Sequence, residues 1–198
     1  MRRAMACAVV ALAGTAALAA TPAMAATQDQ SEPAPVASVD VARYTGKWYQ
    51  VAAVPAPYEA QCLKNSTARY ALTEAGTVSV KNSCTSYFGL TSSVKGDAKP
   101  LDTSGARLNV SFLGLNGRYA HGQDANYIVV GLDTHYQWAV VTDSKRRSGF
   151  VLSRTPRLGA EQTHAAQTAL RGAGVDPCTV AYTPQDGGNT TTSPFCKG

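Results

Sequence analysis

The chain has 198 residues, of which 44% are hydrophobic and 16% are charged, and its formal net charge is +5. This charge is too small to indicate a protein that binds nucleic acid. The sequence lacks the motifs of serine hydrolases, P-loop proteins and zinc proteases, and no cluster for a metal is formed by His121, His135 and His164, which lie far apart.

The first 25 residues have the pattern of a secretory signal peptide. Two arginines precede an uncharged run over residues 4–20, and the small residues Ala23 and Ala25 then form a cleavage site. A transmembrane anchor is the alternative, but the run is short and rich in alanine for a membrane span. Residues 1–25 are therefore interpreted as a signal peptide, and the mature chain is expected to begin at Ala26.

Removal of this segment leaves 16 basic and 13 acidic side chains, a net charge of about +3, because the segment contains two arginines and no acidic residue. Cys7 lies too early, and in the wrong sequence context, to be the lipidated cysteine of a lipoprotein. We therefore expect a secreted, extracellular protein, a monomer or weak dimer, without a stable membrane anchor and with at most transient membrane contact. Nucleic acid is not expected as a partner.

Residues 26–38 contain proline and polar residues but no apolar period, which predicts a disordered leader. The folded domain is expected at residues 39–185, followed by a polar tail at residues 186–198. Short strand-like segments alternate with turn sequences through most of this domain. Eight strands are predicted, at residues 46–54, 64–72, 77–84, 90–100, 106–113, 125–133, 136–142 and 149–154.

Most connections between these strands are short. The sequences "TEAG", "DTSG" and "SKRRSG" each contain a glycine where a tight turn needs a positive φ angle, so consecutive strands are expected to be antiparallel neighbours. The basic turn at residues 143–149 is interpreted as a solvated hairpin, with contact to a polyanion or a membrane surface as the alternative. The first connection, residues 55–62, is longer and contains two prolines, so we expect it to lie across an opening.

One helix is predicted after the eighth strand. Pro156 precedes a run of helix-forming residues, and Gly172 and Gly174 end it. A modest apolar stripe on this surface helix is formed by Leu158, Ala165 or Ala166, Ala169 and Leu170. A short strand is expected at residues 178–183.

Four cysteines remain in the mature chain, and an even number in a secreted protein indicates two disulfides. Sequence proximity favours Cys62 with Cys84 and Cys178 with Cys196, and the alternative joins Cys196 to Cys62. Counted from the "TEAG" turn, Cys62 and Cys84 are not directly opposite, so their bridge requires a bulge. The second bridge would tether the polar tail.

The predicted fold class is all-β. Eight antiparallel strands with short connections form either a sandwich of two sheets or a closed up-and-down barrel. Closure removes exposed sheet edges, so the pattern slightly favours an eight-stranded barrel with one helix packed outside it and a short extra strand.

Three separated motifs occur along the chain, in the order "TGKWYQVA", "VVGLDTHYQWAVV" and "FVLSRTPRL". In this order they resemble the first-strand, sixth-to-seventh-strand and eighth-strand motifs of the lipocalin family, and in particular of its bacterial branch related to apolipoprotein D. The resemblance covers about residues 40–185, and Leu132 stands where the family often has threonine.

The resemblance implies roles for five residues. Trp48 would plug one end of the barrel, Arg154 would pack across its ring, and Gly46 would let the backbone approach beneath it. Asp133 and Tyr136 would order the neighbouring turn. His135, between them, is interpreted as a turn residue rather than a haem ligand.

The same resemblance implies a cup that binds a small hydrophobic or amphipathic ligand, such as a fatty acid, lysophospholipid, sterol-like molecule or pigment, without catalysis and without a cofactor or metal. Only half of each strand faces inward, and outward packing under the helix is the competing interpretation for any aromatic residue. The candidate ligand-binding residues are Tyr58, Tyr70, Tyr87, Phe88, Phe112, Tyr127 and Trp138.

Two alternatives stay open at this point. An isomerase or de-epoxidase would need acidic groups in the cup, but Glu59, Glu74 and Asp102 fall in predicted loops and form no obvious pair. Capture of a siderophore or a peptide is the other alternative, and a siderophore usually requires several basic side chains that converge inward. The candidates, scattered over strands and turns, are Lys64, Arg69, Lys81, Lys95, Lys99 and Arg107.

Overall fold

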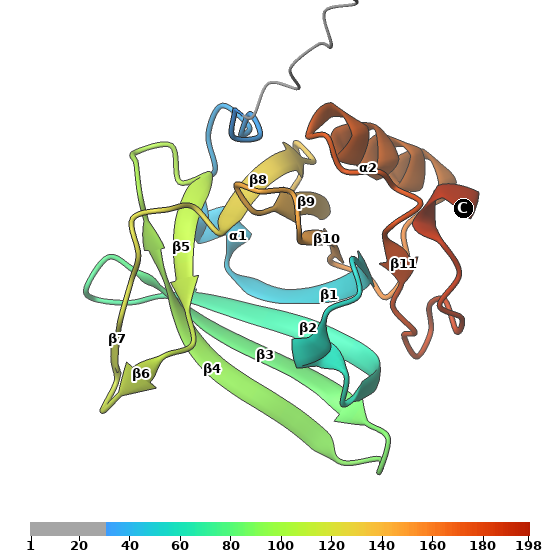
Figure 1. Cartoon of the computed structure of the whole chain (residues 1–198), viewed down its shortest axis with the longest axis horizontal. Coiled ribbons are helices and arrows are strands. Elements are labelled where there is room, and N and C mark those ends of the chain that lie inside the picture. Colours follow the sequence, from blue (N-terminus) through green and yellow to red (C-terminus); the bar gives the residue numbers. More distant parts are fainter. Residues whose placement is uncertain (1–30) are drawn as a thin grey trace, which may run out of the picture. The chain divides into compact units, whose positions relative to one another are not determined.

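The computed structural model of the chain describes residues 31–198, so the predicted signal peptide and residues 26–30 lie outside the described residues. Nine strands form the main sheet, and eight of them make an antiparallel barrel (Figure 1). These eight are β1 (Gly46–Ala53), β2 (Cys62–Leu72), β3 (Val78–Ser86), β4 (Thr91–Pro100), β5 (Arg107–Ser111), β8 (Tyr127–Leu132), β9 (Trp138–Thr142) and β10 (Gly149–Ser153). Pairing of β10 with β1 closes the barrel, which confirms the predicted fold and excludes the sandwich.

Each barrel strand begins and ends within two residues of its predicted limits. The structure adds short elements that have no period long enough to read from sequence. They are the hairpin of β6 (Gly114–Leu115) and β7 (Arg118–Tyr119), the helix α1 (Val41–Tyr44) and the single 3-10 turns η1 (Pro57–Glu59) and η2 (Phe195–Lys197). The predicted last strand is reduced to β11 (Ala181–Tyr182), which pairs with β1 outside the barrel.

Trp48 closes one end of the barrel, and its side chain is fully buried. The guanidinium of Arg154 lies 3.7 Å from the centre of the Trp48 ring, a geometry in which the cation is attracted to the ring face. This guanidinium also donates hydrogen bonds to the backbone oxygens of Arg43, Lys47 and Tyr136. One planar side chain therefore connects the ring to three separate backbone segments.

Gly46 and the turn before β9 shape this seal. Gly46 has a φ angle of +94°, and a Cβ at this position would lie 3.4 Å from Nη1 of Arg154, so a side chain would be strained and would crowd the guanidinium. The Asp133 carboxylate accepts hydrogen bonds from two backbone amides of its own turn. The Tyr136 hydroxyl accepts a hydrogen bond of 2.8 Å from the Asp40 amide, which connects this turn to the start of α1.

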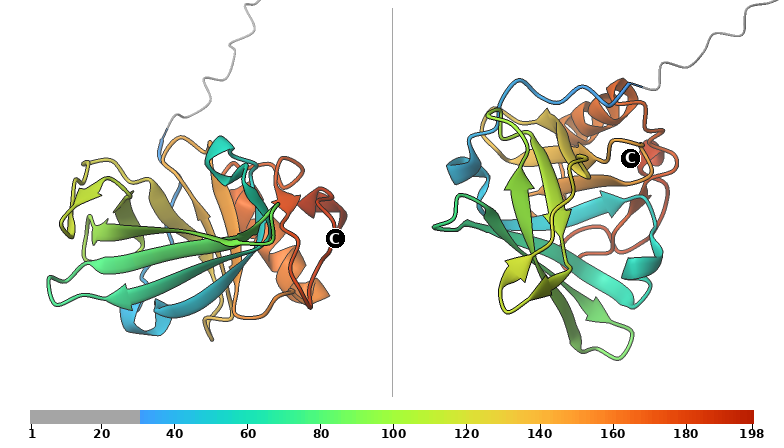
Figure 2. Two further views of the ribbon diagram at one scale, coloured as in Figure 1. Left: turned by 90° about the horizontal axis from the view of Figure 1, so that it is seen from below. Right: turned by 60° about the vertical axis from the view of Figure 1, so that its left-hand side comes forward.

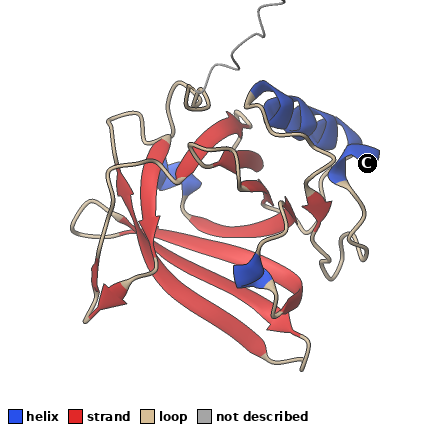
Figure 3. Cartoon of the chain, in the orientation of Figure 1, coloured by secondary structure: helices blue, strands red, loops and turns tan. Residues whose placement is uncertain are grey.

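Helix α2 (Ala160–Gly172) lies along the outside of the barrel and contacts β8 and β9 (Figure 3). Ala166 and Leu170, on the predicted apolar stripe, are fully buried and pack against the outward side chains of the barrel. The helix begins after Gly159 rather than directly after Pro156. None of the helices in residues 31–198 has the length and apolar character that crossing a membrane requires.

The segment before α1 contacts the barrel, although the sequence predicted a disordered leader over residues 26–38. The backbone amide of Val36 donates to the oxygen of Val129 at 2.8 Å, and Glu32 forms an ion pair with Arg107. The pairing between β5 and β8 spans only two residue pairs. Backbone groups beyond this short ladder are therefore free to form hydrogen bonds with the leader. Such contacts depend on the tertiary structure, so the amino-acid composition of the leader does not predict them.

The C-terminal segment is also more than a polar tail. Phe195 is fully buried in the outer core cluster, between the barrel and α2. The buried side chain of Gln185 donates from Nε2 to the backbone oxygens of Gln50 at 2.9 Å and Ser66 at 2.8 Å. Since β1 and β2 are paired only as far as Tyr49, this amide bridges the two strands where their ladder has ended.

Both predicted disulfides are present, Cys62–Cys84 and Cys178–Cys196. The pairing of β2 with β3 shifts register twice beyond Cys62, so the bulge that the first bridge required is found. The second bridge joins the segment after α2 to the last turn of the chain.

Candidate ligand-binding site

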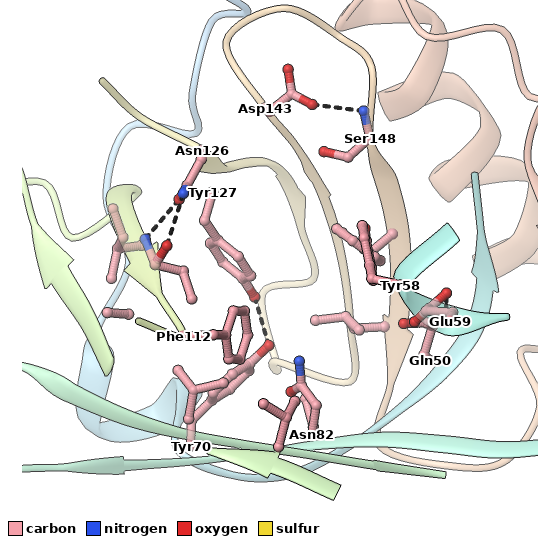
Figure 4. Close-up of a pocket in the computed structure, with 18 of the residues that line it drawn as sticks. Gln50, Tyr58, Glu59, Tyr70, Asn82, Phe112, Asn126, Tyr127, Asp143 and Ser148 are labelled. Atoms are coloured by element: carbon pink, nitrogen blue, oxygen red, sulfur yellow. Dashed lines mark hydrogen bonds between the residues drawn. The ribbon is translucent and has the colours of Figure 1, made fainter. Parts of the chain in front are cut away.

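The barrel encloses a cavity of about 970 Å³ (Figure 4). Its lining extends from Tyr44, which contacts Trp48, to the connections at the opposite end of the barrel. Such a volume is in the range of sites for small molecules. Inward side chains of the strands form its walls because successive residues of a strand face opposite sides of the sheet. The apolar part of the wall includes Ala68, Val78, Val80, Ala98, Leu108 and Leu152.

Three tyrosines lie together at the deep end of the cavity. The hydroxyls of Tyr44 and Tyr127 are 2.9 Å apart, and the Tyr127 hydroxyl donates to that of Tyr70 at 3.2 Å. Burial raises the pKa of Tyr70 to about 12, and it raises the pKa values of Tyr44 and Tyr127 well above their ordinary value. All three groups therefore stay neutral hydroxyls at physiological pH.

Asn82 adds an amide to the same region. It follows Val78 and Val80 on the inward face of β3 and precedes Cys84, and all four residues line the cavity. Its Oδ1 is buried and has no hydrogen-bond partner among the residues that the structure describes. An unpaired buried oxygen of this kind costs about 1–3 kcal/mol.

Charged groups gather at the mouth, in the connections of the open end. The Glu59 carboxylate accepts a hydrogen bond of 3.2 Å from Nε2 of Gln50. Burial raises the pKa of Glu59, and that hydrogen bond only partly offsets it. Burial also raises the pKa of Tyr58, with smaller effects from the charges of Glu59 and Asp143. Asp143 differs: burial opposes its ionisation, but hydrogen bonds from Ser148 and its turn amides lower its pKa.

The Glu59→Gln substitution is expected to stabilise the protein near neutral pH. The raised pKa means that the folded protein binds the Glu59 proton more tightly than the unfolded chain, so stability is lost as the pH rises through that raised value. Glutamine keeps an acceptor for Gln50 and cannot ionise. Thermal melts should give the variant the higher Tm at about pH 7, with the difference vanishing below the ordinary glutamate pKa of 4.5. A difference that stays constant with pH would exclude ionisation as its cause.

Four of the seven candidate aromatic residues line the cavity. Tyr58 is at the mouth, in the connection predicted to lie across an opening, and it remains 62% exposed. Tyr70 and Tyr127 are at the deep end, and Phe112 lies on the wall just after β5.

The other three candidates are not among the residues that line the cavity. Tyr87 and Phe88 are in the turn after β3, where the strand alternation has ended, and they are 64% and 89% exposed. Trp138 begins β9 facing outward and packs against α2 in the outer cluster, whereas its neighbour Ala139 faces inward. The sequence analysis also missed Tyr44, which precedes β1, and Asn82, whose position two residues after Val80 on a strand could have indicated it.

The charged candidates do not converge in the cavity. None of the six basic candidates is among the lining residues identified within residues 31–198. Lys64 pairs with Asp186 and Arg107 with Glu32, and the remaining four are exposed. Of the three acidic candidates, Glu59 lines the cavity, whereas Glu74 and Asp102 lie in connections at the closed end. Within the same residues no three His, Cys, Asp or Glu side chains gather to hold a metal.

Comparisons with known proteins agree with this architecture. The model of the lipocalin-like domain family matches residues 39–185. The chain is 31% identical over 143 residues to a lipocalin of Acanthamoeba polyphaga mimivirus, covering 71% of this chain and 81% of that protein. It is 32% identical over 143 residues to apolipoprotein D of Mus musculus, covering 69% of this chain and 72% of that protein.

Solved structures show the same fold at lower identity. Insecticyanin from the tobacco hornworm Manduca sexta has a TM-score of 0.60 at 16% identity, over 81% of this chain and 92% of that one. Lobster apocrustacyanin A1 has a TM-score of 0.57 at 18% identity, over 86% of this chain and 97% of that one. The match of the family model over residues 39–185, together with the two relatives, shows that the chain belongs to the lipocalin family.

Proposed function

We propose that the protein binds a small hydrophobic or amphipathic ligand in the barrel cavity and carries or scavenges it without chemical change. The observation that carries this proposal is the cavity of about 970 Å³ with an apolar wall, sealed at one end by Trp48 and open at the other. Transfer of ligand surface from water into such a site contributes roughly 25 cal/mol per Å². Fatty acids, lysophospholipids, sterol-like molecules and pigments are the ligand classes proposed.

The proposed setting is outside the cell. Two disulfides and the signal-like residues 1–25 support a secreted protein, and apolipoprotein D, a relative, is associated with lipid by its name. Membership of the bacterial branch of the family and a monomer or weak dimer remain parts of this proposal. Native mass spectrometry with lipid extraction, on protein purified from its own secretions, would identify the bound species.

A larger side chain inside the cavity should weaken ligand binding. Ala98 faces inward on β4 and is buried, whereas its neighbour Lys99 faces outward and is exposed. Ala98→Phe is expected to weaken binding of the neutral fluorescent probe N-phenylnaphthylamine by at least about tenfold, because the ring occupies ligand space. Lys99→Phe adds the same ring to the other face of the strand and should leave the affinity unchanged. Equal affinities for both variants, with both folded, would exclude the cavity as the binding site.

An enzyme that isomerises or de-epoxidises an apolar substrate is the second candidate function. Glu59 favours it, because a carboxyl whose pKa is raised by burial lies at the cavity mouth beside Tyr58. Turnover of a bound substrate that is lost in Glu59→Gln, with binding retained, would support this function over simple carriage. Binding without turnover in both proteins would exclude it for that substrate.

A further inference from the structure

The hydroxyl chain at the deep end of the cavity has a direction. Tyr127 donates its proton to Tyr70, so the bond between Tyr44 and Tyr127 must use the proton of Tyr44. The proton of Tyr70 then has no acceptor among residues 31–198, although Tyr70 is only 8% exposed. The chain therefore ends in an unused O–H donor beside the cavity.

An unused acceptor lies on the neighbouring strand, β3, and also lines the cavity. Tyr70 pairs with Val80 across β2 and β3, and Asn82 is two residues further along the same inward face. Diagonal neighbours of this kind are about 7–8 Å apart at the backbone, close enough for their side chains to contact one shared group. Figure 4 shows both side chains entering the cavity from the strands beneath it. Oδ1 of Asn82 is buried and has no hydrogen-bond partner within residues 31–198.

Among residues 31–198, no charged side chain lines the deep end of the cavity to match an ionised ligand. The charged residues that line the cavity all lie in connections of the open end. They are Glu59, Asp124, Asp143, Lys145 and Arg147. A carboxylate placed beside Tyr70 and Asn82 would lose its hydration without gaining a cation, which is costly in an apolar site. A neutral polar group meets no such penalty.

We propose that the cavity selects long apolar molecules that end in an alcohol, and that the ligand enters with its hydroxyl first. The ligand hydroxyl accepts a hydrogen bond from the Tyr70 hydroxyl and donates one to Oδ1 of Asn82. An alcohol satisfies both groups, whereas an ether or a ketone can only accept and leaves the Asn82 oxygen unpaired. This inference rests on the proposed function, because it assigns the ligand class of the same cavity.

A matched series of ligands tests the proposal. Tetradecanol, its methyl ether, tetradecanoate and tetradecane share one chain and differ only at the end group, and each is titrated against bound N-phenylnaphthylamine. The wild-type protein is expected to bind the alcohol about tenfold more tightly than the ether, which corresponds to one buried hydrogen bond. Tetradecanoate should bind more weakly than the alcohol at a pH where it is ionised.

Two variants locate the selectivity. Asn82→Leu should reduce the affinity for the alcohol to that for the ether while retaining affinity for tetradecane, because leucine removes the amide and keeps the volume. Tyr70→Phe should weaken binding of the alcohol and of the ether alike relative to tetradecane, because both oxygens accept the hydrogen bond from Tyr70. Ser92→Ala removes a hydroxyl from β4 elsewhere on the cavity lining and should leave the ratio of alcohol to ether affinities unchanged. Melting curves of each variant check that the barrel is folded.

The outcomes separate this inference from the proposed function. Equal wild-type affinities for alcohol and ether, tighter binding of tetradecanoate, or an unchanged preference in Asn82→Leu would overturn the inference while the carrier function stands. Failure of the probe and all four ligands to bind the folded wild-type protein would overturn both. Alcohol preference that is lost in Asn82→Leu and kept in Ser92→Ala would establish it.

Discussion

Trp48→Ala is expected to lower the free energy of unfolding by about 3–5 kcal/mol, the usual cost of removing a large buried aromatic side chain. The indole is fully buried, and its N–H donates to the backbone oxygen of Tyr44 at 2.8 Å. The Tyr44 ring lies 4.9 Å from the indole, so the substitution also removes support from the deep end of the cavity. Denaturant unfolding followed by tyrosine fluorescence would measure the loss.

Arg154→Lys separates the contribution of the guanidinium from that of the ring. Lysine keeps the charge but not the planar group that reaches three backbone oxygens, so we expect a loss of about 1.5–3 kcal/mol. Arg157→Lys, at an exposed position three residues later, is the matched control and should change stability little. When Trp48→Ala and Arg154→Lys are combined, the two losses of stability should not add, because the two side chains form one contact. Additive losses of stability would contradict the role assigned to this seal. An unchanged denaturant midpoint of unfolding in Trp48→Ala would contradict it as well.

The sequence predicted the barrel strands because their signals are local. Strand limits follow from alternating apolar residues and from turn glycines, and the three motifs then chose the barrel over the sandwich. The hairpin of β6 and β7, the contacts of the leader and the bridge made by Gln185 depend instead on where neighbouring strands stop pairing. That information exists only after the barrel has closed.

The candidate site was predicted less completely, for a related reason. Tyr127 and Trp138 are both aromatic residues at the start of a strand, and only the register of the closed sheet places one inside and the other beneath α2. A search restricted to aromatic residues also overlooks polar ones. Asn82 lies on the same face of its strand as Val78 and Val80, whose apolar side chains indicate that this face points inward. Burial of the Asn82 oxygen without a partner is a property of the folded cavity alone.

Phe195→Ala is expected to lower the free energy of unfolding by about 3–5 kcal/mol, although this residue is close to the end of a polar segment. Its ring is fully buried and lies 5.0 Å from that of Tyr182. Its backbone amide donates to the oxygen of Val180 at 2.8 Å, and its own oxygen accepts from Nε2 of Gln167 at 2.8 Å. If the disulfide alone held the tail, truncation of this ring would cost little.

The disulfide Cys178–Cys196 provides the comparison, since replacing both cysteines with serine is expected to cost about 3 kcal/mol in the chain-entropy model. In that model the disulfide stabilises the protein by restricting the unfolded chain, and not by holding the folded tail in place. The tail of the serine variant should therefore stay docked through Phe195 and resist limited proteolysis. In Phe195→Ala the tail remains covalently attached but loses its buried ring, and cleavage near residues 186–194 should accelerate. The opposite pattern, with protection that follows the disulfide and ignores the ring, would mean that the bridge holds this segment.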